Sequence, residues 1–228
     1  MFGLPTSTEV KKQLPKKAIY SKFDMSASQR ERFDADISRI DIVAIVSLKT
    51  VPTLAEGEDV KEFYVLGVQL KRKEYDPKNI TMLTKLIPHK MVFALCCEEE
   101  IQFAIYHTKL ITSDWKQTDE ATLLLSGLNL DAVWDNIVKS IGHIKVVEGN
   151  TLTEQIKADE EQAKLLAQIK TLERKIACEK QPRRKREYFE QIKNEKRRKS
   201  DESNGNCAQS RRAWKSGASD GDPPGDEY

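Results

Sequence analysis

The sequence predicts an α/β (α+β) fold, a small mixed sheet with flanking helices, followed by a charged helical hairpin or short coiled coil and a disordered tail. Three observations support this prediction. Apolar β-branched runs alternate with amphipathic helical patterns over residues 1–148. A highly charged segment with a short heptad seam follows over residues 149–199. Ser, Asn, Gly, Asp and Pro dominate residues 200–228, which is typical of disorder.

The first part of the predicted α/β domain contains a helix followed by a strand. Residues 5–23 include two prolines and are expected to form only one or two helical turns. A helix is expected over residues 24–35, with Asp24 or Ser26 as its cap. The β-branched run at residues 37–47 predicts a strand.

The clearest local pattern is a βαβ unit. Residues 63–70 predict a buried strand. Asp76 and Pro77 suit the start of a helix, because an acceptor at the cap followed by proline fits the first turn. This helix is expected to continue to Pro88. Residues 91–95 then form a second strand, which a right-handed crossover would place parallel to the first.

The domain is expected to close with a hairpin and a helix. Residues 101–106 predict an antiparallel partner for the preceding strand, and residues 110–115 an edge strand. Asn129 can cap an amphipathic helix over residues 130–141, and Gly142 suits the position just after it.

The arm begins with a capping-box spacing from Thr151 to Glu154. Four apolar residues of the arm then recur with the spacing 4-3-4 and form a heptad seam, which lasts only about two heptads. Pro182 then interrupts the helix, and a second helix is expected to place three apolar residues on one side. Two arrangements fit this pattern, a hairpin whose apolar stripes meet or one kinked helix that pairs with another molecule. The seam consists of Leu165, Ile169, Leu172 and Ile176, and the second stripe of Tyr188, Phe189 and Ile192.

Charge is distributed unevenly along the chain. Residues 1–150 carry 20 Lys and Arg against 21 Asp and Glu, whereas residues 180–199 carry ten Lys and Arg against three Glu, a local net charge of +7. A helix with this charge can follow a phosphate backbone. A competing interpretation is a solvated face balanced by the acidic stretch 159–161. The candidate nucleic-acid-binding residues are Arg183, Arg184, Lys185, Arg186, Lys193, Lys196, Arg197 and Arg198.

An alternative function follows from the predicted order of helix, strand, strand, helix and strand, which resembles the core of restriction-type nucleases. That chemistry needs acidic groups to hold Mg²⁺ and a lysine to orient the attacking water. Asp41, Gln69 and Lys71 lie where those residues would be, although glutamine is a poor metal ligand. No other cofactor or metal is expected.

Other chemistries lack support in the sequence. The three histidines have no partners at metal-ligand spacing, and no Gly-rich phosphate loop or nucleophile elbow is present. The four cysteines form no CxxC pair. The chain shows no secretory signal pattern and no apolar run that could span a bilayer, so a cytoplasmic location is expected.

Several short motifs together carry a resemblance to a known family. The chain resembles the bacterial domain of unknown function 4391 (DUF4391) over about residues 1–199. Members of that family occur near helicases and DNA methyltransferases in restriction-like and phage-defence gene clusters. The resemblance therefore implies a non-catalytic accessory protein with a helicase or methyltransferase partner, by association. The motifs are residues 2–5 (FGLP), 68–71 (VQLK), 87–88 (IP), 91–95 (MVFAL), 104–109 (AIYHTK), 172–176 (LERKI), 179–181 (EKQ) and 184–185 (RK).

Overall fold

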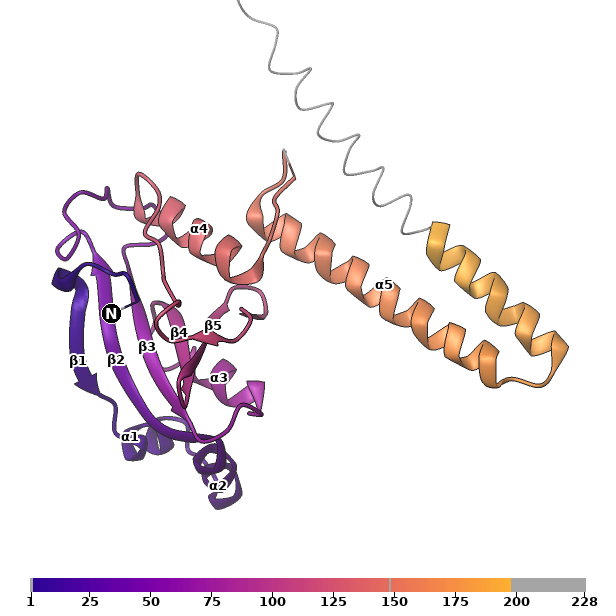
Figure 1. Ribbon diagram of the computed structural model, residues 1–228, viewed down its shortest axis with the longest axis horizontal. Helices are drawn as coiled ribbons and strands as arrows, with labels where there is room; N and C mark the ends of the chain where they lie inside the picture. The colour runs from indigo at the N-terminus through magenta and orange to yellow at the C-terminus, as the bar shows by residue number, and fades with distance from the viewer. Residues whose placement is uncertain (1, 148, 198–228) are drawn as a thin grey trace, which may run out of the picture. The chain divides into compact units, whose positions relative to one another are not determined.

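The structure is a computed structural model that describes residues 2–147 and 149–197. The described chain divides into two compact units, with the boundary between Lys145 and Val146 (Figure 1). The predicted tail over residues 200–228 and the candidate residue Arg198 lie outside the described residues. None of the helices in the described ranges combines the length and the apolar character that crossing a bilayer requires.

The first unit is built on a mixed sheet of seven strands. Its strand order is β1-β2-β3-β4-β5-β6, and β7 pairs with β5. Only the β3–β4 pair is parallel in this described sheet. The strands are β1 (Glu9–Gln13), β2 (Ile37–Ser47), β3 (Glu62–Leu70), β4 (Lys90–Cys97), β5 (Glu100–Tyr106), β6 (Leu110–Thr112) and β7 (Lys116–Gln117). The predicted α/β class is thereby confirmed.

The N-terminal segment differs from its prediction. A 3-10 turn, η1 (Thr6–Thr8), leads into strand β1, and helix α1 (Lys16–Lys22) follows. The prediction of helical turns alone was wrong for β1, which pairs with β2 at the edge of the sheet. This strand is almost entirely exposed, so it lacks the apolar alternation that identifies a strand from sequence.

The predicted βαβ unit is present and lies at the centre of the sheet. Asp76 caps helix α3 (Pro77–Leu83), its side chain accepting from the Lys78 backbone N–H. The helix ends earlier than predicted, because the chain passes into turns with i to i+3 hydrogen bonds at Lys85 and Leu86. Strand β4 then returns parallel to β3.

Helices cover both faces of the sheet. Helices α1, α2 (Ala27–Asp36) and α3 pack their buried side chains against the face that contains Leu66. Helix α4 (Leu130–Gly142) covers the opposite face, where the Trp134 ring meets Phe63 edge-on at 5.7 Å. Each face therefore has its own apolar layer, which a doubly covered central strand requires.

The helix caps follow the sequence closely. Ser26, and not Asp24, caps α2 in a reciprocal capping box with Gln29. Asn129 caps α4 by accepting from the Ala132 backbone N–H. The left-handed residue at the end of α4 is His143 (φ 50°) and not the predicted Gly142.

The carboxylate of Asp131, in the first turn of α4, holds the loop that leads into β3. Its two oxygens accept from the backbone N–H groups of Glu58 (2.6 Å) and Val60 (2.8 Å). Gly57 is needed beside them, because a Cβ there would lie 2.4 Å from the Asp131 Oδ1.

Gly57→Ala is therefore expected to lower the free energy of unfolding by about 1–3 kcal/mol, since the methyl group displaces the carboxylate from its two backbone hydrogen bonds, of which the one from Val60 is partly buried. Urea denaturation followed by circular dichroism measures this change. A double-mutant cycle provides the control, because Gly57→Ala should cost much less when Asp131 is already alanine. Equal costs in both backgrounds would contradict the explanation.

Candidate nucleic-acid interface

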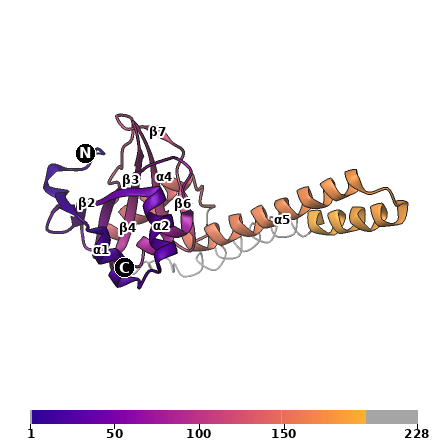
Figure 2. The ribbon, with the colours of Figure 1, turned by 90° about the horizontal axis from the view of Figure 1, so that it is seen from below.

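The second unit contains a helical hairpin. Helix α5 (Leu152–Cys178) begins at the Thr151–Glu154 capping box that the sequence predicts. A second helix over residues 182–197 folds back beside it (Figures 1 and 2). Of the two predicted arrangements, the chain adopts the hairpin.

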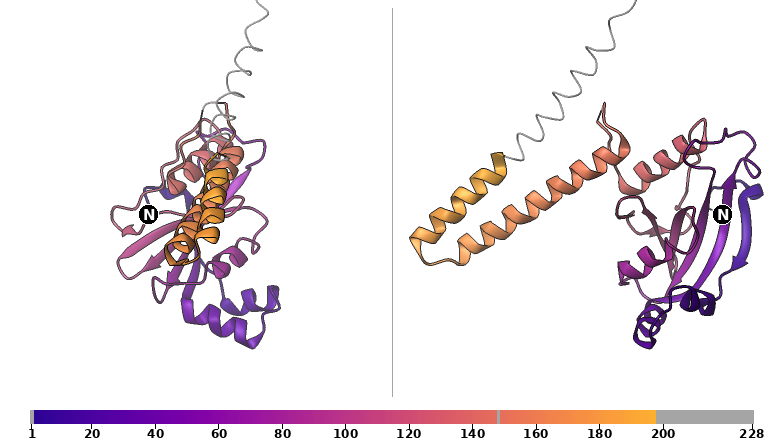
Figure 3. Two further views of the ribbon diagram at one scale, coloured as in Figure 1. Left: turned by 90° about the vertical axis from the view of Figure 1, so that its right-hand side faces the viewer. Right: turned by 180° about the vertical axis from the view of Figure 1, so that it is seen from behind.

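Apolar side chains lie between the two helices. Ile169 and Ile192 are 6% and 7% exposed, and the other three seam residues of α5 are half-buried. The Lys175 ammonium lies 6.0 Å from the centre of the Tyr188 ring, and Lys196 approaches Glu173 at 4.0 Å. These contacts join the two helices side by side, as both views of Figure 3 show.

The turn between the helices is organised by Glu179. Its carboxylate accepts from the backbone N–H groups of Lys180 (2.9 Å) and Gln181 (3.0 Å). The hydrogen bond from Gln181 is the main cause of the lowered pKa of this carboxyl, and Arg184 and Lys185 add to it. Pro182 then occupies the first position of the second helix, where the missing N–H costs nothing.

The second helix presents most of its cations to solvent. Residues 180–197 carry eight Lys and Arg against three Glu, a net charge of +5. The Arg183 side chain is 93% exposed and pairs with Glu187 at 3.6 Å, and Arg184 is 60% exposed. Lys185 differs from its neighbours because it is half-buried. The described cations from the prediction therefore lie on one helix, mostly on its outer side.

The acidic stretch 159–161 does not balance the cations near the turn between the two helices. Asp159 accepts from the Gln155 side chain at 2.8 Å and Glu160 pairs with Lys164 at 2.8 Å, both inside α5. About 25 Å of helix separate Glu161 from the end of α5 at Cys178. Since this distance exceeds the Debye length of about 8 Å at physiological salt, the excess positive charge near the turn persists.

Phe189 departs from the predicted stripe. Its side chain is 58% exposed, whereas Tyr188 and Ile192 face α5. With Ile192 it forms the apolar part of a shallow, open hollow whose remaining lining is Lys193, Lys196 and Arg197. An exposed phenyl ring that lines a hollow together with three cations is a feature that the sequence pattern did not predict.

Two residues of the nuclease alternative, Asp41 and Gln69, lie on the paired strands β2 and β3, and Lys71 follows β3. Asp41 pairs with Gly67 and Gln69 with Arg39, so both side chains lie on one face of the sheet. The Asp41 carboxylate is held by the Arg39 guanidinium at 2.7 Å. Lys71 follows the strand, and its backbone N–H donates to the Asp36 carbonyl. No group of three or more His, Cys, Asp and Glu in the described ranges is arranged to hold a metal.

A buried carboxylate that sequence reasoning missed is Asp36, at the junction of α2 and β2. Its side chain is 4% exposed and pairs with Arg72 at 2.9 Å. It also accepts from the Asp76 backbone N–H and the Asn79 side chain, both at 2.9 Å. Burial acts to raise the pKa of Asp36, but these hydrogen bonds and Arg72 outweigh it and lower the pKa. Asp36 thus joins α2, the loop after β3 and α3.

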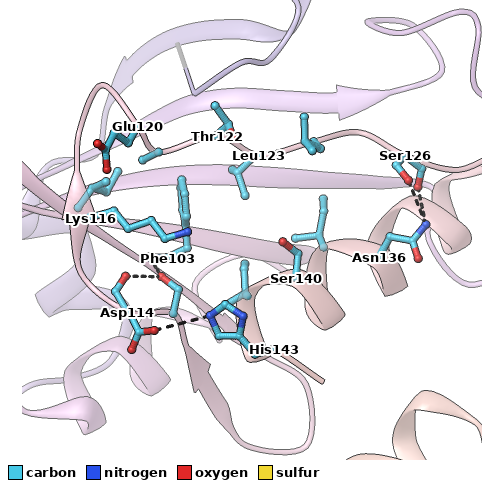
Figure 4. Close-up of a pocket in the computed structure, with 16 residues that line it drawn as sticks. Phe103, Asp114, Lys116, Glu120, Thr122, Leu123, Ser126, Asn136, Ser140 and His143 are labelled. Atoms are coloured by element: carbon cyan, nitrogen blue, oxygen red, sulfur yellow. Dashed lines mark hydrogen bonds and ion pairs between the residues drawn. The ribbon is translucent and has the colours of Figure 1, made fainter. Parts of the chain in front are cut away.

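The α/β unit also contains a cavity of about 190 Å³, lined by β5, the segment after β6 and helix α4 (Figure 4). Several of its polar groups form local hydrogen bonds or ion pairs. Ser113 Oγ accepts from the Phe103 N–H and donates to the Asp114 carbonyl. Asp114 and His143 form an exposed pair at 3.7 Å. The Ser113 hydroxyl is therefore engaged with backbone groups of two neighbouring segments.

The family model described as "Domain of unknown function (DUF4391)" matches residues 2–198. No curated protein and no solved structure matches the chain.

Proposed function

The chain belongs to the DUF4391 family, and from this premise we propose that it is a non-catalytic accessory protein whose arm binds the backbone of a nucleic acid. The observation that carries the proposal is the excess of exposed cations on the helix over residues 182–197. Cations in a row along a helix neutralise successive phosphates and release their counterions.

Such binding would depend little on base sequence. Lys and Arg contacts to phosphates position a protein on a nucleic acid but do not read its bases. An accessory subunit needs this property when a partner enzyme supplies the specificity. The proposed partner is a helicase or a DNA methyltransferase in the bacterial cytoplasm, which rests on the family resemblance alone.

The direct test is the binding of the full-length protein to fluorescein-labelled oligonucleotides, measured by anisotropy from 50 to 300 mM NaCl. We expect the logarithm of the association constant to fall linearly with the logarithm of the salt concentration. Binding that does not depend on salt, or no binding at 50 mM NaCl, would contradict the proposal. Affinity purification from the native host then tests whether a helicase or methyltransferase is recovered with the protein.

The Mg²⁺-dependent nuclease stays a second prediction, because Asp41 and Gln69 lie on one face of the sheet. Its test is DNA cleavage with and without Mg²⁺ by the wild type and by Asp41→Ala. Cleavage that needs both Mg²⁺ and Asp41 would support the nuclease. Cleavage that is absent, or that survives Asp41→Ala, would exclude Asp41 as a metal ligand.

A further inference from the structure

The exposed ring of Phe189 requires an explanation that phosphate binding alone does not provide. Three cations, Lys193, Lys196 and Arg197, line the same hollow as this ring. Positions 189, 193, 196 and 197 are separated by three or four residues along the helix, so they share one face. Phosphate oxygens attract the cations but gain nothing from a phenyl ring, so a ligand that contacts the whole face also offers an apolar surface.

We infer that this hollow binds single-stranded nucleic acid, with an unpaired base stacked on Phe189 and the neighbouring phosphates on Lys193, Lys196 and Arg197. The inference rests on the proposed function and names the substrate class of the same helix. Every base has an aromatic face that can cover a phenyl ring, and this stacking tolerates any sequence. In a duplex that face is already covered by the adjacent bases, so the ring would stay in water.

The hollow is less suited to two other polyanionic ligands, an anionic membrane and an acidic protein segment. A membrane-binding helix needs a broad apolar face, but the inward face of this helix is occupied by Tyr188 and Ile192 against α5. That leaves one exposed ring. An acidic protein segment could meet the cations, but its carboxylates do not stack on a ring. Charge complementarity combined with one exposed aromatic therefore favours a single strand.

The experiment compares a single-stranded 15-mer with a duplex of equal length, as DNA and as RNA, on the full-length protein. We expect Phe189→Ala to weaken single-strand binding by about 5- to 100-fold, which corresponds to the loss of one stacked base. Duplex binding should stay unchanged. Phe189→Tyr should restore single-strand affinity, since the ring is retained.

The chain offers a matched control in Leu166, an exposed apolar residue of the same arm. Its side chain is 49% exposed and lies on α5, and Leu166→Ala should leave both affinities unchanged. A 2-aminopurine in the strand gives an independent signal, because stacking quenches its fluorescence. Wild type should quench it and Phe189→Ala should not. Circular dichroism verifies that the helical content of each variant is retained.

The remaining outcomes are distinct. Equal single-strand and duplex binding that is insensitive to Phe189→Ala would overturn the single-strand inference and leave the proposed function intact. Absence of binding to every oligonucleotide would overturn both. A Phe189-dependent affinity for vesicles with phosphatidylserine, or for poly-glutamate, that exceeds the affinity for the 15-mer would assign the hollow to a membrane or an acidic protein instead.

Discussion

Replacing Arg183, Arg184, Lys185 and Arg186 by glutamine is expected to flatten the salt dependence of nucleic-acid binding strongly. Each lost phosphate contact reduces the slope of log affinity against log salt by about 0.7–0.9, so four lost contacts reduce it by about 3. Lys185 is half-buried and is the least accessible of the four side chains. If only the other three residues contact phosphates, the slope falls by about 2–3. Affinity near 50 mM NaCl should fall by several orders of magnitude.

The control for this variant removes the same charge elsewhere. Lys11, Lys12, Lys17 and Lys49 are exposed residues of the α/β unit, and changing them to glutamine lowers the net charge equally. If the total charge of the protein determined the salt dependence, the slope of log affinity against log salt would decrease equally in both variants. A slope that stays steep in the arm variant and flattens in the control would assign binding to the α/β unit. Anisotropy with one oligonucleotide over the same salt series measures both.

Asp36→Ala is expected to lower the free energy of unfolding by about 2–4 kcal/mol at pH 7. The change removes a nearly buried carboxylate that Arg72, the Asp76 N–H and Asn79 all contact, and these partly exposed donors lose their acceptor. Asp34 provides a matched control on the same helix. It pairs with Lys16 but is 43% exposed, so Asp34→Asn should cost less than about 1 kcal/mol.

The contribution of Asp36 should depend on pH in a defined direction. Because its pKa is lowered in the folded protein, the stabilisation is complete above the ordinary carboxyl value of about 4 and is lost as the pH falls through the folded value. Urea denaturation at pH 7, 5, 4 and 3 should therefore show the wild type and Asp36→Asn converging below about pH 4. A constant difference down to pH 3 would contradict this explanation.

The helices and central strands could be predicted because their patterns are local. The βαβ unit and the helix capped by Asn129 depend on periodicity and cap residues that lie within a few positions of each other. Strand β1 could not be predicted, since it is defined by its pairing with β2 and not by an apolar pattern. A short exposed edge strand has no such pattern to detect.

The candidate site could be predicted only in part. The cationic run is visible in the sequence, but the face it occupies depends on how the two helices of the arm meet. Tyr188 and Phe189 are about 100° apart around a helix, and apolar spacing alone does not decide which of them faces α5. Asp36 was missed for a similar reason, because Arg72 and Asn79 are distant from it in sequence.

The contact between the two arm helices has a consequence for how tightly the arm can hold a ligand. Past residue 160, Ile169 and Ile192 are the apolar side chains of the described arm with less than a tenth of their surface exposed. Because this apolar layer is so small, we expect the second helix to open locally and its amide hydrogens to exchange before those of the sheet. A bound nucleic-acid strand that requires the two arm helices to be packed together would slow that exchange. The free energy of packing the helices together would then contribute to the affinity for the nucleic acid.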